Sequence, residues 1–121
     1  MASMNRITWW QWVPLPWRKW RVVVNVDAGD EVPDRLPHRG VALVGPIVWP
    51  TWAAFDCLCG RGHRIMINLD PSRQPWWRVE SRKPLSIEPS IHDITPSRRC
   101  HFALRRGRIA WSVDAGEGIE L

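Results

Sequence analysis

The chain has 121 residues and a formal net charge of +5, with 15 Arg, 2 Lys and 12 acidic residues. A chain of this length forms one domain that hides roughly two-thirds of the surface its unfolded form exposes, enough for one modest core. Its apolar runs are far shorter than the roughly 20 residues that cross a bilayer, and no apolar signal segment opens it, so we expect a cytoplasmic protein without membrane partners.

Eleven prolines and eight glycines leave little room for long helices. Short β-branched or alternating runs between turn residues predict an all-β, loop-rich antiparallel domain over residues 21–113. A Trp-rich arm over residues 1–20 precedes this domain, and a loose acidic tail over residues 114–121 follows it. The only helix we expect is a turn inside residues 91–97, and residues 105–107 form a hairpin loop. The predicted strands, in chain order, are residues 21–27, 41–44, 51–58, 63–69, 76–80, 85–88, 100–104 and 108–113.

The three cysteines form two short clusters. Cys57 and Cys59 lie on a glycine-rich corner, and Cys100 follows about 40 residues later, a layout typical of a structural zinc site. His63 is the candidate for a fourth ligand, and the odd cysteine count argues against a disulfide framework. Buried reduced thiols and a catalytic cysteine are the two alternatives.

A serine and a histidine form the second candidate site. Ser90 follows a proline, and His101 lies eleven residues further on. A nucleophilic serine needs a base within hydrogen-bond reach. If residues 100–104 form a strand, Cys100 and His101 point to opposite faces, so that Cys100 can face a metal while His101 faces Ser90. An ordinary turn serine is the alternative.

Arginine and tryptophan side chains form the third feature. Arg98 and Arg99 belong to a group of arginines around the last predicted hairpin, and Trp76 and Trp77 are adjacent, so on a strand one of them faces outward. Arginine binds phosphate and tryptophan stacks on bases, which makes nucleic acid one candidate partner. A solvated basic face and a docking surface for an acidic protein are the alternatives.

Four sequence pieces occur in the order found in a known family. The chain resembles the BubE family, small bacterial and phage proteins encoded beside ubiquitin-like conjugation genes, over about residues 30–113. It departs from that pattern where Arg61 replaces a third cysteine and where Cys100 and His101 are adjacent instead of separated by two residues. The pieces are CLCGRGHRI (57–65), LSIEPSI (85–91), CHF (100–102) and RRGRIAW (105–111).

The resemblance implies a cytoplasmic peptidase of a bacterial or phage-encoded ubiquitination-like pathway, which processes or deconjugates a ubiquitin-like protein by a serine mechanism. Ser90 would be the nucleophile, His101 the base, and Trp77, Arg98 and Arg99 would hold the substrate tail. The implied partners are the ubiquitin-like protein and its E1/E2-like conjugation machinery. A non-enzymatic zinc-binding interaction module and a basic nucleic-acid-binding module are the alternatives.

Overall fold

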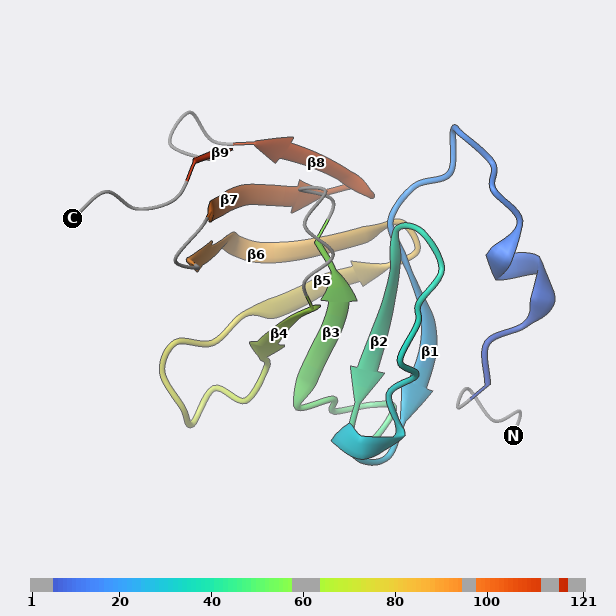
Figure 1. Cartoon of the computed structure of the whole chain (residues 1–121). Coiled ribbons are helices and arrows are strands. Elements are labelled where there is room, and N and C mark those ends of the chain that lie inside the picture. Colours follow the sequence, from blue (N-terminus) through green and yellow to red (C-terminus); the bar gives the residue numbers. More distant parts are fainter. Residues whose placement is uncertain (1–5, 58–63, 95–97, 112–115, 118–121) are drawn as a thin grey trace.

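Strands dominate the architecture. The computed structural model describes residues 6–57, 64–94, 98–111 and 116–117. Within these ranges nine strands form two sheets, and the only helices are two short 3₁₀ turns (Figure 1). The all-β prediction is therefore confirmed. In the same ranges, no helix has the length and apolar character needed to span a bilayer.

The first sheet contains two strands that are buried on both faces. Its strands, in order across the sheet, are β1 (Arg21–Val26), β2 (Gly40–Val44), β3 (Trp52–Asp56) and β4 (Arg64–Asn68). β1 and β2 are parallel, and the two following pairs are antiparallel. In β2, Val41 and Leu43 belong to the core between the sheets. Ala42 and Val44 pack on the opposite face with Leu36, which explains why the β2 run has no polar side.

The second sheet is antiparallel, and its strands run across those of the first sheet in Figure 1. Its strands are β5 (Arg78–Arg82), β6 (Leu85–Ile94), β7 (Arg98–Arg105) and β8 (Arg108–Trp111), and the short β9 (Gly116–Glu117) also pairs with β7. The helical turn predicted inside residues 91–97 is wrong for residues 91–94, which continue β6. Ile91 is drawn into the core opposite Phe102, so this stretch is extended instead. Residues 95–97 lie outside the described ranges.

Three aromatic side chains connect the two sheets through the core. Trp20, Phe55 and Phe102 are almost fully buried. The ring centroids of Trp20 and Phe55 lie 5.6 Å apart and those of Phe55 and Phe102 lie 6.2 Å apart, both edge to face. Burial of each such side chain stabilises the fold by about 1.5–3 kcal/mol. The packing therefore fixes β3 of the first sheet against β7 of the second.

The turn between β7 and β8 joins the sheets a second time. Arg106 and Gly107 have φ values of 51° and 77° and form a two-residue turn, one residue shorter than the predicted loop. The Trp20 amide donates to the Gly107 carbonyl at 2.9 Å, and the Gly107 amide donates to the Leu85 carbonyl at 2.7 Å. A Cβ atom on Gly107 would lie 2.5 Å from the Cβ of Lys19. Only glycine fits this position.

We expect Gly107→Ala to lower the free energy of unfolding by about 1–3 kcal/mol, because alanine is strained at this φ and meets Lys19. Gly29→Ala is the control, since Gly29 begins the 3₁₀ turn η2 (Gly29–Glu31) and its added Cβ meets no heavy atom within 4 Å. Urea denaturation of both variants measures the difference. Equal losses of stability in the two variants would contradict this account of the turn.

Candidate active site

The site begins with an irregularity in the pairing of β6 with β7. Ile87 pairs with Leu104 and Ile91 pairs with Phe102, so β6 advances four residues while β7 advances two. All four side chains stay buried, and the surplus residues between the two isoleucines must leave the regular ladder. Such bulges bend a strand and turn individual side chains in new directions. Proline lacks an amide hydrogen and is tolerated at a bulge, which accounts for Pro89 inside a strand.

The bulge brings Ser90 to His101. In β7, Cys100 and Phe102 are fully buried, whereas His101 between them is half-buried on the opposite face. The Ser90 Oγ and His101 Nε2 atoms lie 3.2 Å apart, within hydrogen-bond distance. The hydroxyl can donate to this nitrogen when the imidazole is neutral and its other nitrogen carries the proton. The structure thus brings together the two residues that the sequence suggested as a pair.

Trp77 holds the backbone of the bulge. Its indole Nε1–H donates to the Ser90 carbonyl at 3.2 Å, and its ring packs against the core. The position of Trp77 depends on Asn68, a buried residue at the end of β4 that sequence reasoning missed. Asn68 Nδ2 donates to three carbonyls of the loop over residues 70–75 at 3.0 to 3.1 Å, and its backbone carbonyl accepts from the Trp77 amide at 2.8 Å. The sequence did contain a signal for this role, because Asn68 is a polar residue at the end of an alternating run and precedes a loop that contains prolines.

Two adjoining hollows lie beside Pro89, the residue that precedes Ser90. A hollow of about 480 Å³ is lined in part by Pro89, the neighbour of Ser90, and by Trp76. A second hollow of about 360 Å³ is lined by Trp76 and Trp77 together with Trp49. Because Trp76 lines both hollows, they form one surface that begins beside the bulge. This surface can accept apolar side chains of an extended peptide.

The arginines differ in how far the structure describes them. The backbone of Arg98 and Arg99 belongs to β7 and pairs with β9, but their side chains lie outside the described part. Their role in holding a substrate tail therefore stays a prediction. Arg105 forms an ion pair with Glu88, at the start of the bulge. This contact ties β7 to β6 beside the candidate pair.

Cys57 and Cys100 meet in the core from different sheets, with their Sγ atoms 3.5 Å apart. Two thiolates on one tetrahedral zinc, each at 2.3 Å, would lie about 3.8 Å apart, so this pair fits half of a zinc site. Cys59 and His63 lie outside the described residues. Within the described ranges, no group of three or more His, Cys, Asp and Glu side chains is arranged to hold a metal.

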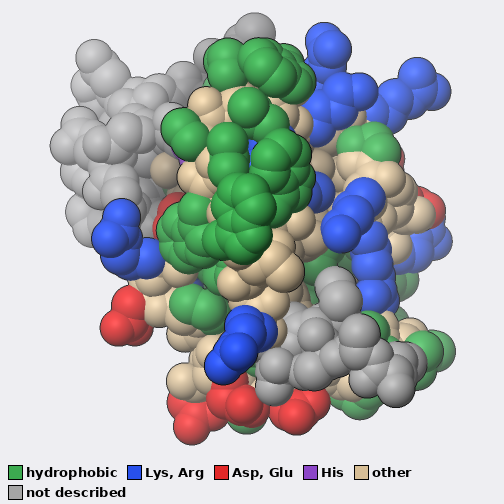
Figure 2. Space-filling model, turned by 90° about the vertical axis from the view of Figure 1, so that its right-hand side faces the viewer, with side chains coloured by type: hydrophobic (Ala, Val, Ile, Leu, Met, Phe, Trp, Pro, Cys, Tyr) green, Lys and Arg blue, Asp and Glu red, His purple; other side chains and the backbone are tan. Residues whose placement is uncertain are grey.

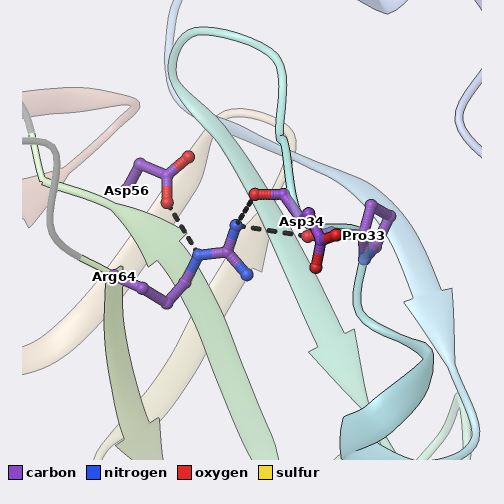
Figure 3. A network of polar contacts seen from close by, with 4 residues as sticks. All are labelled: Pro33, Asp34, Asp56 and Arg64. Atoms are coloured by element: carbon purple, nitrogen blue, oxygen red, sulfur yellow. Dashed lines mark hydrogen bonds and ion pairs between the residues drawn. The ribbon is translucent and has the colours of Figure 1, made fainter.

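Arg64 fixes the strand ends that lead into and out of residues 58–63 (Figure 3). Its Nε atom donates to Asp56 Oδ1 at 2.7 Å, which joins the end of β3 to the start of β4. Its terminal nitrogen donates to the carbonyls of Pro33 and Asp34 at 3.2 and 3.0 Å. The Arg64 side chain thus holds three segments together next to Cys57.

A serine hydroxyl within hydrogen-bond distance of a histidine imidazole is the nucleophile–base contact that serine hydrolases use. The chain belongs to the family described as bacterial ubiquitination-like system serine protease (BubE), whose model matches residues 28–112. The matched range contains Ser90 and His101 and begins after β1. No curated protein and no solved structure gave a match.

Replacing Trp77 with phenylalanine tests the contact with the bulge. Trp77→Phe keeps an aromatic ring in the core but removes the donor to the Ser90 carbonyl, so we expect a loss of about 0.5–1.5 kcal/mol of stability. Trp49→Phe is the matched control, because the Trp49 side chain is 67% exposed. Urea denaturation is the measurement, and a larger loss for Trp49→Phe would contradict the proposed support.

Proposed function

We propose that this protein hydrolyses the bond after the C-terminal residue of a ubiquitin-like protein, in a precursor or in a conjugate. The observation that carries the proposal is the 3.2 Å contact between Ser90 Oγ and His101 Nε2. Membership of the BubE family supplies the serine protease class and the ubiquitination-like pathway. The ubiquitin-like protein and its E1/E2-like machinery are the proposed partners.

The two residues suffice to write a balanced reaction. Ser90 Oγ attacks the carbonyl carbon of the scissile bond, and its proton passes to His101 Nε2. The carbon–nitrogen bond breaks as His101 returns this proton to the leaving amine, which leaves an acyl ester on Ser90. A water molecule then gives a proton to His101 and attacks the ester. The ester carbon–oxygen bond breaks as His101 returns this proton to Ser90 Oγ, which restores the serine hydroxyl and releases the C-terminal carboxyl group of the ubiquitin-like protein.

The groove suits an extended tail. Trp77 and its neighbour Trp76 form an apolar surface beside the bulge, and Trp49 extends it. A tail that ends in small residues can bring its last carbonyl to the half-buried Ser90 without a side chain in the way. We assign Trp77 and the arginines Arg98 and Arg99 to this tail, with the tryptophan contacting apolar side chains and the arginines contacting carbonyl or carboxylate oxygens.

Burial argues against a nucleophilic cysteine among the described residues. The side chain of Cys100 is 0% exposed and that of Cys57 is 6% exposed, so neither sulfur can reach the carbonyl of a bound peptide. A thiol in apolar surroundings also loses acidity and with it nucleophilic thiolate. Ser90, by contrast, is half-buried, and its neighbour Pro89 lines a surface hollow.

A structural zinc ion is the second part of the proposal. Cys57 and Cys100 supply two ligands, and Cys59 and His63 are the proposed others. When bound, the ion braces the β3–β4 connection against β7, the strand that carries His101, without an open coordination position. Elemental analysis of the purified protein should find one zinc per chain, and Cys57→Ser should lose both zinc and stability. A fully folded, metal-free protein from zinc-supplemented cells would overturn this part.

The cleavage assay uses the full chain and a fusion of the cognate ubiquitin-like protein to a C-terminal reporter. Ser90→Ala and His101→Ala should each reduce the rate at least roughly a thousandfold, because each removes a reacting group. Ser81→Ala is the control, because Ser81 donates to the Pro84 carbonyl and does not contact Ser90 or His101. This variant should cleave the fusion at the wild-type rate.

Urea midpoints separate loss of chemistry from loss of fold, because replacing Ser90 removes few contacts and should leave the midpoint close to that of the wild type. Two outcomes would overturn the assignment. One is cleavage by Ser90→Ala at the wild-type rate. The other is a folded Cys59→Ser variant, with zinc content unchanged, that is inactive while Ser90→Ala is active.

A further inference from the structure

The N-terminal segment over residues 6–20 displays its tryptophans instead of burying them. Trp9 and Trp17 are 76% and 74% exposed, and Trp10 and Trp12 are also exposed, whereas Trp20 at the end of the segment is buried. Figure 2 views the molecule from this side and shows hydrophobic side chains down the centre of the face, with Lys and Arg side chains beside them. This segment is the described part of the Trp-rich arm and is called the arm below. It precedes residues 28–112, which the family model matches.

Side-chain contacts hold the arm in one path. Arg18 donates to the carbonyls of Trp10 and Val13 at 2.8 and 3.1 Å. Arg21 donates to the backbone carbonyl and the side-chain oxygen of Gln11 at 2.8 and 2.9 Å. Arg39, from the segment before β2, donates to the Arg18 carbonyl at 2.6 Å. The exposed indoles are therefore presented by a fixed backbone, which lowers the entropy lost when a partner binds.

These contacts leave positive charge uncompensated. Among the described residues, every hydrogen bond from Arg18, Arg21 and Arg39 goes to a carbonyl or amide oxygen, and none goes to a carboxylate. Burial, together with the charges of Arg18 and Arg39, lowers the pKa of Arg21 to about 10. A cluster of cations that oppose one another's charge favours an anionic partner.

A cleft of about 440 Å³ lies between the arm and the β7–β8 hairpin. Its lining contains no acidic residue among those described. Its cationic lining residues are Arg18, Lys19, Arg39 and Arg108, and its aromatic ones are the buried Trp20 and the exposed Trp17 and Trp111. Trp111 is exposed like Trp17 and rests on Phe102 at 5.2 Å between ring centroids, so its ring is supported from below.

Single-stranded nucleic acid matches this combination better than the other polyanions. Each nucleotide offers a phosphate to the cations and a flat base to an indole face, and both contacts strengthen binding. An acidic peptide would pair with the cations but leave the two indoles without planar partners. A lipid surface is flat and contacts protruding side chains, whereas Trp17 and Trp111 line a cleft.

We infer that the cleft between the arm and the β7–β8 hairpin binds single-stranded nucleic acid. Phosphates lie against Arg18, Arg39 and Arg108, and bases stack on Trp17 and Trp111. This binding goes beyond the proposed cleavage of a ubiquitin-like protein and does not depend on Ser90.

The test is fluorescence anisotropy of the full chain with a labelled 20-nucleotide oligo-dT at several salt concentrations. Three neutralised phosphates, one each at Arg18, Arg39 and Arg108, predict a slope of about −2 for log K against log salt, since each contributes about 0.7 for a single strand. Trp17→Ala should weaken binding roughly tenfold or more, because one base–indole stack is lost. Arg108→Ala should reduce the slope by about 0.7. Both side chains are exposed, so neither change should lower the urea midpoint.

Matched controls come from the opposite side of the molecule. Trp49 is 67% exposed but lines the groove beside Trp77, and Arg73 is an exposed arginine of the β4–β5 loop. Trp49→Ala and Arg73→Ala should bind oligo-dT like the wild type. The inference is overturned by absence of binding at 50 mM salt, by equal losses in the controls, or by poly-glutamate or anionic phosphatidylserine vesicles binding as tightly with the same dependence on Trp17.

Discussion

The pairing of β6 with β7 is the constraint on which the site depends. Both strands must keep their apolar side chains in the core, and Ile87 and Ile91 do so although β6 contains two residues more than β7 between the paired positions. The extra residues of β6 interrupt its hydrogen-bonded pairing with β7 at Pro89, which has no amide hydrogen to donate. Ser90 is thereby displaced toward His101, which the alternation of β7 places away from the core. Core packing thus creates the polar contact.

Contacts other than the β6–β7 pairing hold Ser90 in place and attach the arm to the second sheet. Asn68 fixes the loop that carries Trp77, and Trp77 holds the Ser90 carbonyl. On the other side, the backbone of Trp20 is bonded to the β7–β8 turn and to the start of β6. Because the arm ends at Trp20, its exposed indoles are attached to the same sheet as the candidate catalytic pair. One small domain can therefore carry a proteolytic site and a separate binding cleft.

The sequence predicted what depends on local pattern. Prolines and short β-branched runs were enough for the all-β class, and the alternation around Cys100 was enough to send His101 and Cys100 to opposite faces. The bulge could not be predicted, because the surplus in β6 exists only relative to its partner strand. The hydrogen bonds of Asn68 could not be predicted for the same reason, because the carbonyls that accept them come close only when the loop has folded. Long-range pairing, in each case, decides what local propensity leaves open.

The most direct test of the central claim is labelling by a fluorophosphonate, which reacts with a serine only when a base removes its proton. After incubation of the intact protein at neutral pH, mass spectrometry of proteolytic fragments locates the adduct. The contact between Ser90 and His101 predicts a single adduct on Ser90, lost in His101→Ala although that variant keeps the serine. An adduct on another residue, or labelling of Ser90 at the same rate without His101, would contradict the account.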